Sequence, residues 1–347
     1  MSERRAAREA ERTAQRRAKP RRKPLLIAIG STLGSLIAVA VVIAVAASTF
    51  VGGLARSYDE NKTVLADPFP KAARPAPTLT TAMNILLIGS DSRASDVAED
   101  DGFTGGRSDT LMLAHLPANR DGVYLMSIMR DSWVNVPGHG AAKINAAYSW
   151  GGIPLTVQTV EQLLDIRIDH VAQIDFAGFK GMTDALGGVT VQSPQAFTGP
   201  GGTQFTAGAN RLDGKHALAF VRERHAFADA DYTRVRNQQA FMRGLAEGAL
   251  AKGTVTNPGR VQDFVTATSK YLSVDEGLDF QTLVSLGWSL RDTRPGDLHT
   301  FTIPTAGGGV SADGQSYVAL NNLALQELSQ SLRSDTLGTW VSEDALN

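Results

Sequence analysis

The sequence predicts an α/β protein, in which a three-layer α/β/α extracytoplasmic domain with a central mixed sheet is preceded by one transmembrane helix. Three observations support this prediction. A long apolar stretch without charges lies near the N-terminus. Beyond it, short apolar runs typical of buried strands alternate with segments of helical periodicity. Hydrophobic residues make up 43% and charged residues 20% of the 347 residues, as in an ordinary folded domain.

The N-terminal part predicts a membrane anchor. Residues 1–24 form a basic tail with ten Lys or Arg against three Glu, and residues 25–54 are uncharged and mostly apolar. A bilayer core requires about 20 such residues in a helix. The positive charges before the run place the N-terminus in the cytoplasm, so we expect a single-pass protein of the cell membrane. The alternative is a cleavable signal peptide, because Ala44-Val45-Ala46 has the spacing of a cleavage site.

A linker and one extracytoplasmic domain are expected after the anchor. Residues 55–82 contain four prolines and few apolar residues, which predicts a semi-extended Pro-rich linker. The domain is then expected over residues 83–340, with folded structure from Met83 onward. The expected strands are residues 85–88, 111–116, 124–129, 171–174, 189–191, 217–221 and 298–303. The expected helices are residues 154–165, 176–186, 238–252, 261–272, 280–290 and a segment near 317–332.

Composition and motifs narrow the classes of function. The chain has no cysteine, which excludes disulfides, thiolate metal sites and a cysteine nucleophile. Outside the basic tail the net charge is negative, which argues against nucleic-acid binding. The glycine-rich stretches fit neither a P-loop nor a dinucleotide fingerprint, and no Gly-x-Ser-x-Gly elbow is present.

Arginines in the middle of the chain predict a site for a multiply charged anion. Arg130 follows an expected strand, and Arg222 and Arg224 would share one face if the strand at 217–221 continued through them. Two guanidinium groups on one face repel each other unless an anion lies between them, and their planar forks match phosphate oxygens. Arg234 and Gln238 would share a helical face if a helix has begun there, and its N-terminus would also favour an anion. The alternative for Arg130 is a local ion pair with its neighbour.

Two acids predict a metal site near the same anion. Asp91 follows the strand at 85–88 and Asp109 precedes the strand at 111–116. If these strands are antiparallel neighbours, the two carboxylates lie at the same sheet edge. Mg²⁺ typically binds one or two carboxylates and completes its shell with water and phosphate. The alternative is one turn Asp and one strand-cap Asp, both of which are common.

Seven short motifs, taken together, identify a family. They are Gly89-Ser-Asp-Ser-Arg93, Arg107-Ser-Asp-Thr-Leu-Met112, Ser127-Ile-Met-Arg-Asp131, Lys143-Ile-Asn-Ala-Ala-Tyr148, Asp184-Ala-Leu-Gly-Gly-Val189, Val221-Arg-Glu-Arg224 and Asp231-Tyr-Thr-Arg-Val-Arg-Asn-Gln-Gln239. With these motifs in this order, the sequence resembles the LytR-CpsA-Psr family of bacterial cell-envelope proteins. Two positions depart from the family pattern: Met129 stands where Pro is usual, and Asn237 stands where a second arginine usually precedes the two glutamines.

The resemblance implies roles for individual residues. Asp91 and Asp109 would bind Mg²⁺ or Mn²⁺, and Arg130, Asp231 and Arg234 would be catalytic. The residues implied to bind the pyrophosphate of the substrate are Arg93, Lys143, Arg222, Arg224, Arg236 and Gln238.

The resemblance also implies an activity. A glycopolymer transferase would take a glycan from a polyprenyl-pyrophosphate carrier in the membrane lipid and join it to peptidoglycan through a phosphodiester. We expect an apolar pocket for the carrier tail, lined by Phe176, Phe179, Met182 and Leu186. Two alternatives remain: a hydrolase that cleaves the pyrophosphate with water, and a non-catalytic envelope regulator that binds lipid-linked glycan.

Overall fold

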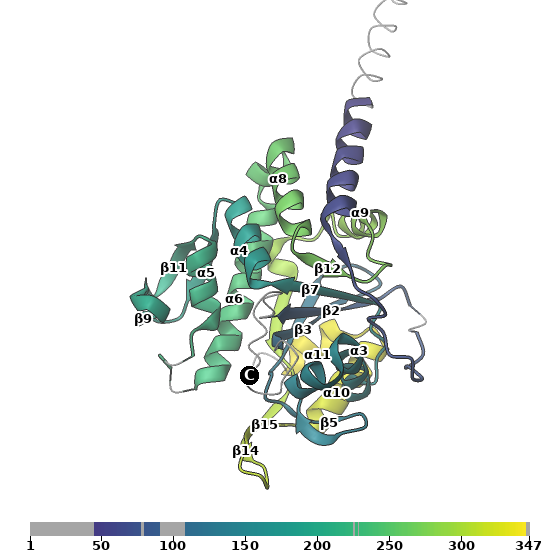
Figure 1. Cartoon of the computed structure of the whole chain (residues 1–347), viewed down its shortest axis with the longest axis vertical. Coiled ribbons are helices and arrows are strands. Elements are labelled where there is room, and N and C mark those ends of the chain that lie inside the picture. The colour runs from purple at the N-terminus through teal and green to yellow at the C-terminus, as the bar shows by residue number, and fades with distance from the viewer. Residues whose placement is uncertain (1–44, 78–79, 91–107, 225, 228, 345–347) are drawn as a thin grey trace, which may run out of the picture. The chain divides into compact units, whose positions relative to one another are not determined.

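The computed structural model describes residues 45–77, 80–90, 108–224, 226–227 and 229–344, and the chain divides into two compact units, residues 1–53 and 54–347 (Figure 1). Within the first unit, residues 45–53 are helical. No helix among the described residues is long and apolar enough to cross a bilayer. The basic tail and residues 25–44 of the expected span lie outside the described ranges.

A seven-stranded mixed sheet is the centre of the second unit. In spatial order its strands are β1 (Thr63–Val64), β12 (Leu272–Val274), β7 (His170–Asp175), β2 (Met83–Ser90), β3 (Ser108–Leu116), β4 (Val123–Ile128) and β13 (Leu298–Thr302). Three neighbouring pairs are parallel: β1 with β12, β7 with β2 and β4 with β13. The other three are antiparallel. The predicted α/β class and mixed sheet are confirmed.

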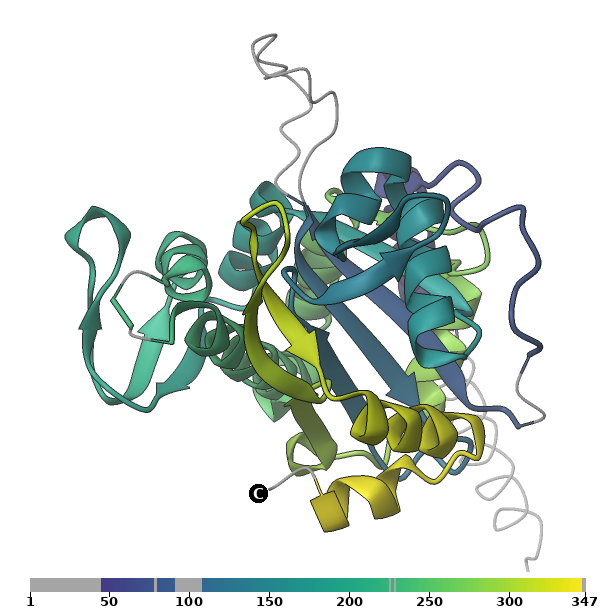
Figure 2. The same cartoon turned by 90° about the horizontal axis from the view of Figure 1, so that it is seen from below.

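Helices cover both faces of this sheet (Figures 1 and 2). On one face, α3 (Asn145–Leu164), α10 (Asn322–Arg333) and α11 (Leu337–Asp344) pack against the largest apolar cluster, which contains Leu86, Leu113 and Met126 from the strands. On the other face, Met242 of α6 (Ala230–Leu250) and Leu286 of α9 (Phe280–Ser289) pack against a smaller strand cluster. The described part of the domain therefore has helical layers on both sides of the sheet, because the central strands are apolar on both faces.

A second group of elements builds its own apolar cluster beside the sheet. Its elements are α4 (Phe176–Ala185), β8 (Val189–Ser193), β9 (Phe197–Thr198), β10 (Gln204–Phe205), β11 (Gly208–Leu212), α5 (Gly214–Arg222) and α6. Phenylalanines dominate this cluster, and the rings of Phe197, Phe205 and Phe220 contact one another. These contacts join α5 to β9 and β10, and Phe179 of α4 contacts Phe241 of α6, with the ring centroids 4.3 Å apart.

The expected strand at 217–221 is wrong, since these residues belong to helix α5. Asp213 caps the helix by accepting a hydrogen bond from the His216 backbone N–H at 2.8 Å. Arg222 is the last helical residue, and Glu223 after it is extended. Arg222 and Arg224 therefore do not share a face by strand alternation.

The other elements complete the domain. They are β5 (Trp133–Val136), β6 (Gly140–Lys143), the 3-10 turn η1 (Pro200–Gly202), α7 (Lys252–Val255), α8 (Pro258–Ser269), the 3-10 turn η2 (Pro295–Asp297), β14 (Thr305–Val310) and β15 (Ser316–Leu320). Helix α6 begins at Ala230, eight residues before the expected start at 238. The helix expected near 317–332 is wrong at its start, because residues 316–320 pair with β14 as a hairpin and the helix begins at Asn322.

Folded structure begins before Met83. Strand β1 extends the edge of the sheet, and the Tyr58 hydroxyl donates to the Leu278 carbonyl at 2.8 Å. Arg74 forms a bidentate ion pair with the buried Glu161 of α3. The described residues between 54 and 77 are thus packed on the domain, whereas their prolines and low apolar content predict a semi-extended linker.

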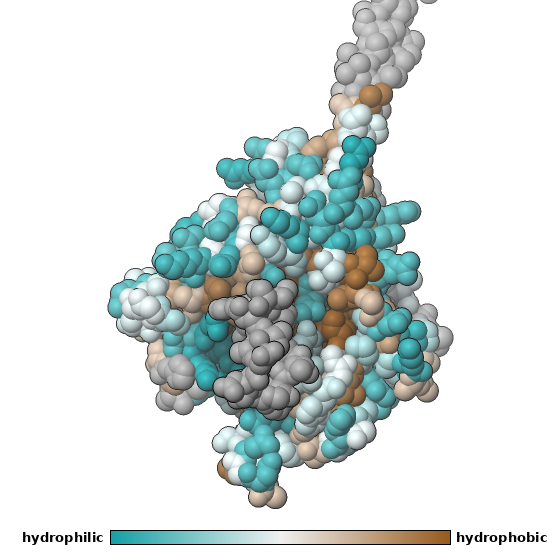
Figure 3. Space-filling view, viewed as in Figure 1, coloured by the Kyte–Doolittle hydropathy of each residue, from teal (hydrophilic) through white to brown (hydrophobic). Residues whose placement is uncertain are grey.

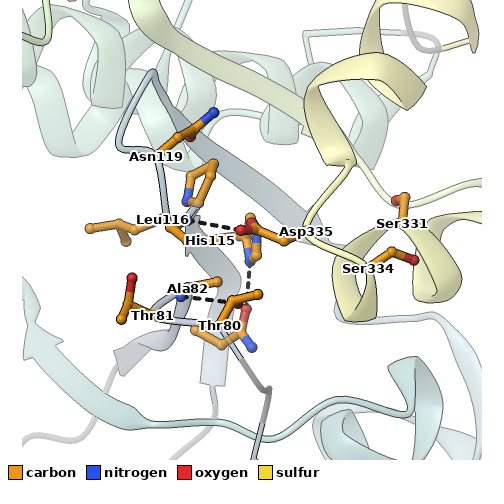
Figure 4. Close-up of polar contacts among 12 residues, drawn as sticks. Thr80, Thr81, Ala82, His115, Leu116, Asn119, Ser331, Ser334 and Asp335 are labelled. Carbon is orange, nitrogen blue, oxygen red and sulfur yellow. Dashed lines mark hydrogen bonds and ion pairs between the residues drawn. The ribbon is translucent and has the colours of Figure 1, made fainter.

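A buried polar network lies where β2 begins and β3 ends. His115 is fully buried, and its Nδ1 lies 2.8 Å from the Asn84 Oδ1. Its Nε2 lies 3.4 Å from a carboxylate oxygen of Asp335, just after α10, and the two side chains point toward each other in Figure 4. Asn84 donates to the Arg167 carbonyl at 2.9 Å, and Asp335 accepts from the Ala118 N–H at 3.0 Å. The network joins the sheet to α10 at this end.

Candidate functional site

A cavity of about 810 Å³ opens at the other end of β2 and β3, between these strands, β7 and helices α4, α5 and α6. Its lining has two chemically different parts, one cationic and one apolar. The outer surface in Figure 3 is mostly hydrophilic. An apolar internal lining beside a cluster of cations is suited to an amphiphilic ligand.

The cationic part of the cavity contains four of the predicted arginines, Arg130, Arg222, Arg224 and Arg234. They come from separate elements: Arg130 lies two residues after β4, Arg222 ends α5, and Arg234 lies in the first turns of α6. The Arg222 guanidinium lies over the Phe176 ring, with its carbon 4.6 Å from the ring centroid. Tertiary packing rather than strand alternation therefore gathers these arginines.

Two polar residues complete this part. Gln238, one helical turn after Arg234 on α6, lines the cavity. Lys215 of α5 also lines it, and the sequence reasoning missed this residue. No sequence signal marks Lys215, because an isolated lysine on an amphipathic helix is normally solvated.

The apolar part lies deeper, between the sheet and the helices. Three of the four residues expected to form a tail pocket, Phe176, Phe179 and Met182, line the cavity, and Leu186 does not. The other apolar lining residues include Leu87, Ile174, Leu218, Phe241, Met242, Leu245 and Leu272. The cavity is thus continuous from the arginines into an apolar space.

A pair of carboxyl groups borders the arginines. Asp131 and Asp231 share a side-chain hydrogen bond, although they are far apart in sequence. Burial raises the pKa of Asp231, and the hydrogen bond and charge of Asp131 raise it further against the pull of Arg234. Burial alone would also raise the pKa of Asp131, but the hydrogen bond with Asp231 and the charges of Arg130 and Lys143 outweigh it and hold this pKa below its usual range. As the pH falls, Asp231 is therefore the member of the pair that takes up a proton first.

Basic residues on either side hold this pair in place. Arg234 Nη2 lies 3.1 Å from an Asp231 oxygen, and Arg130 Nε lies 3.5 Å from an Asp131 oxygen. Lys143 does not line the cavity, and its Nζ lies 3.3 Å from the other Asp131 oxygen. Sequence reasoning treated Asp131 as a local ion-pair partner and missed its contact with Asp231.

The side chains next to Gln238 in α6 point in different directions. Arg236 does not line the cavity; it is exposed and forms an ion pair with Asp229. Asn237 is buried and donates to the Phe220 carbonyl of α5 at 3.2 Å, so this departure from the family pattern ties α6 to α5. Gln239 donates to the hydroxyls of Ser127 and Thr302 at 3.0 and 3.2 Å, which fixes α6 to the sheet.

The expected metal ligands fall partly outside the described residues. Asp91 and Arg93 lie outside them, and the position of Asp109 is described for its backbone alone. Strands β2 and β3 are antiparallel, with Ser90 opposite Ser108 and Gly89 opposite Thr110, so Asp109 is the extra residue of a β-bulge. Gly89 and Thr110 both line the cavity. The end of β2 and the start of β3 therefore meet at the cavity, as the metal hypothesis requires.

Asp109 is the expected metal ligand whose backbone the structure describes. Among the residues whose side chains are described, no group of three or more potential metal-binding side chains gathers. Asp109 lies in β3 at the strand end that borders the cavity, and a carboxylate there would suit Mg²⁺ or Mn²⁺, which take few protein ligands and rely on water and phosphate for the others.

Comparisons with known proteins agree with this arrangement. The model of the LytR_cpsA_psr family matches residues 53–334 of the chain. The probable cell wall biosynthesis protein LcpB of Corynebacterium glutamicum is 38% identical over 235 residues, which cover 65% of this chain and 55% of that protein. The polyisoprenyl-teichoic acid–peptidoglycan teichoic acid transferase TagU of Oceanobacillus iheyensis is 38% identical over 190 residues, which cover 53% and 57% of the two chains. The chain thus spans just over half the length of these two relatives.

Solved structures show the same fold. The crystal structure of Bacillus subtilis TagV has a TM-score of 0.63 at 25% identity and covers 74% of this chain and 97% of that one. A structure of TagT bound to LI-WTA has a TM-score of 0.60 at 25% identity and covers 79% and 99%.

Proposed function

The chain belongs to the LytR-CpsA-Psr family, and we propose that it transfers a glycopolymer from a polyprenyl-pyrophosphate carrier to peptidoglycan, forming a phosphodiester. One observation carries the proposal: a single cavity joins four arginines to an apolar space. A pyrophosphate bound at the arginines would place the polyprenyl tail beside Phe179, Met182 and Phe241. The names of LcpB and TagU, a cell wall biosynthesis protein and a teichoic acid transferase, support the same reading.

The proposed reaction is a displacement at phosphorus. The acceptor hydroxyl oxygen attacks the phosphorus that carries the glycan, and a new P–O bond forms. The bond from this phosphorus to the bridging oxygen breaks, and polyprenyl phosphate leaves with the electron pair. Arg130, Arg222, Arg224 and Arg234 would neutralise the charge that accumulates on the phosphate oxygens.

Asp231 is the proposed general base. A carboxylate whose pKa is raised takes a proton more readily than an ordinary aspartate, and burial and Asp131 provide that rise. The hydroxyl proton would pass to Asp231 as the new P–O bond forms. Neither aspartate lines the cavity. Asp131 is a positioning residue in this scheme, because it acts through its contacts with Asp231, Arg130 and Lys143.

We propose that Asp91 and Asp109 hold the metal ion, Mg²⁺ or Mn²⁺. A divalent cation there would supply positive charge to the pyrophosphate. Asp109→Ala should abolish metal-dependent turnover while leaving the melting temperature of the domain close to that of the wild type. Full turnover in this variant, or in excess chelator, would rule out the assignment.

We also propose that the chain is anchored in the cell membrane by residues 25–54, with the domain outside the cytoplasm. The basic tail before the apolar run supports this orientation. A reporter enzyme that works only outside the cytoplasm should be active when it is fused after Asn347. Activity of a cytoplasm-only reporter at that position would contradict the topology.

The activity is tested with the purified full chain, a polyprenyl-pyrophosphate-linked glycan and peptidoglycan oligomers, with and without Mg²⁺. We expect a covalent glycan–peptidoglycan product whose amount depends on both Mg²⁺ and the acceptor. Release of polyprenyl phosphate at the same rate without acceptor, and no joined product, would identify a hydrolase instead. Absence of any turnover with tight donor binding would favour a regulator.

A further inference from the structure

We propose that Trp133 of β5 and Tyr317 of β15 form a stacking platform for the acceptor saccharide, on the side of the Asp131–Asp231 pair away from the apolar cavity. The proposal rests on the proposed function, because it places the acceptor of that reaction. The two rings are stacked, with their centroids 4.7 Å apart and an interplanar angle of 29°. Both side chains are half-buried, and neither lines the cavity.

The pairing of β5 with β6 places Trp133 beside the carboxyl pair. Trp133 and Lys143 are directly opposite partners in this antiparallel hairpin, so their side chains lie on the same face. The Lys143 ammonium on that face lies 3.3 Å from Asp131, which shares a hydrogen bond with Asp231. A continuous set of contacts therefore leads from Trp133 to the proposed general base.

The β14–β15 hairpin is anchored at the same place. The Val318 N–H donates to the Asp131 carbonyl at 2.8 Å, and the Tyr232 hydroxyl, next to Asp231, donates to the Thr305 hydroxyl at 3.2 Å. Beneath these bonds, Val318 packs with Met129 and Val235 in a small buried cluster. The base of the hairpin is thus fixed to the loop after β4 and to the first turns of α6.

Gly309 positions the Tyr317 ring. Gly309 pairs with Tyr317 across the hairpin, and a Cβ at position 309 would lie 2.4 Å from the Tyr317 Cζ. The ring therefore occupies the space that a side chain would take. With Gly309 against one face and Trp133 stacked on the other, Tyr317 is held in a defined orientation and supports Trp133 from behind. The sugar would stack on Trp133, and this support reduces the entropy lost on binding.

The chemistry of this platform fits a sugar. The faces of pyranose rings carry C–H groups, and aromatic faces bind such surfaces while the hydroxyls around the sugar rim reach polar groups. In the proposed reaction the hydroxyl attacks opposite the leaving polyprenyl phosphate, so the acceptor approaches from the side away from the apolar space. Trp133 lies opposite Lys143, which contacts Asp131, and Tyr317 precedes Val318, whose N–H donates to the Asp131 carbonyl. The sugar that bears this hydroxyl would lie on this side, outside the cavity lining.

The test separates acceptor binding from donor binding in the purified full chain. In Trp133→Ala and Tyr317→Ala, the KM for peptidoglycan oligomers should rise by about tenfold or more, while donor affinity measured without acceptor changes by less than about twofold. Gly309→Ala should raise the same KM, since it displaces Tyr317 without removing a ring. Trp288→Ala is the matched control, because this tryptophan on α9 is 72% exposed and distant in the fold from β5 and β15.

A second measurement does not require turnover. Titration with a β-1,4-linked N-acetylglucosamine tetrasaccharide should give saturable binding to the wild type and to Trp288→Ala, and at least about tenfold weaker binding to Trp133→Ala. An unchanged acceptor KM in both aromatic variants, or unchanged tetrasaccharide affinity, would overturn the platform. If the wild type binds the tetrasaccharide through Trp133 but forms no joined product, the transferase proposal fails and the saccharide site stands.

Discussion

The two ends of strands β2 and β3 carry polar clusters of opposite design. At one end, Asn84, His115 and Asp335 are complementary: hydrogen bonds and a 3.4 Å contact between His115 and Asp335 connect them to each other and to backbone groups. At the other end, like charges are gathered, with four arginines around one cavity and two aspartates sharing a hydrogen bond. Complementary groups stabilise a fold, whereas gathered like charges favour the binding of a ligand of opposite charge. The comparison separates a structural polar cluster from a functional one.

The largest expected effect is on catalysis, at the end of β2 and β3 that borders the cavity. Asp231→Asn should lower kcat by about 10²–10⁴-fold, the usual contribution of a general base, with little change in melting temperature. Wild-type activity should fall as the pH decreases through the raised pKa of Asp231, since the base must be deprotonated, and the variant should lose this acid limb. Asp229→Asn is the control, because Asp229 lies two residues away and pairs with the exposed Arg236. Wild-type kcat in Asp231→Asn would exclude the base assignment.

The next effect concerns the structural end and should appear in stability alone. Asn84→Ala leaves the His115 ring nitrogen and the Arg167 carbonyl without their partner, which costs about 1–3 kcal/mol for each buried group. Chemical denaturation measures this loss. Donor affinity and kcat per folded molecule should stay at wild-type values; a fall in kcat per folded molecule would show that the two ends are coupled.

A smaller effect is expected for a single arginine. Arg222→Ala should weaken donor binding about tenfold, since one charge-assisted contact is worth about 1.5–3 kcal/mol. The melting temperature without donor should change little or rise, because repulsion within the cluster falls. Arg222→Lys should not restore full affinity, since lysine lacks the planar fork. Arg236→Ala, which removes an exposed arginine of α6 that does not line the cavity, is the control. Unfolding of Arg222→Ala with unchanged affinity per folded molecule would make this arginine structural.

The smallest effect is the pH dependence of the structural end. Burial lowers the pKa of His115, against the opposing pull of Asp335. The unfolded chain then binds more protons than the folded chain below the ordinary histidine pKa of about 6.5, so stability falls as the pH drops below that value. Melting temperature should fall by a few degrees between neutral pH and pH 5. His115→Gln should flatten this slope relative to the control His139→Gln, an exposed histidine; equal slopes would show that His115 is not responsible.

The sequence predicted the sheet better than the elements beside it. Strands β2, β3, β4 and β7 have apolar runs bounded by polar residues, and each was found near its expected position. The strand predicted at 217–221 was wrong, because a short apolar stretch is equally compatible with a strand and with a buried helix. Asp213, the N-cap residue of α5, was the feature of the sequence that indicated a helix here.

The sequence motifs predicted most of the residues that line the cavity. They did not predict which side chains tertiary packing directs elsewhere. Four arginines and Gln238 reach one cavity, yet Arg236, two residues from Gln238, points to Asp229. Lys143 contacts Asp131 instead of lining the cavity. The contact between Asp131 and Asp231 spans a hundred residues and depends on where α6 begins, which periodicity alone placed eight residues too late.

The edge of the sheet also constrains the order in which the chain can fold. Thr63 of β1 pairs with Ser273 of β12, so the first strand has its partner only after roughly 210 further residues have been made. Strand β4 likewise gains its second partner strand only once β13 has been made, with Tyr124 opposite His299. Pairings of such long sequence separation close late and slowly, because a large loop must be ordered before they contribute. A chain truncated before Leu272 would therefore leave both β1 and the edge of β7 without a partner strand, and such exposed edges promote association between incomplete chains.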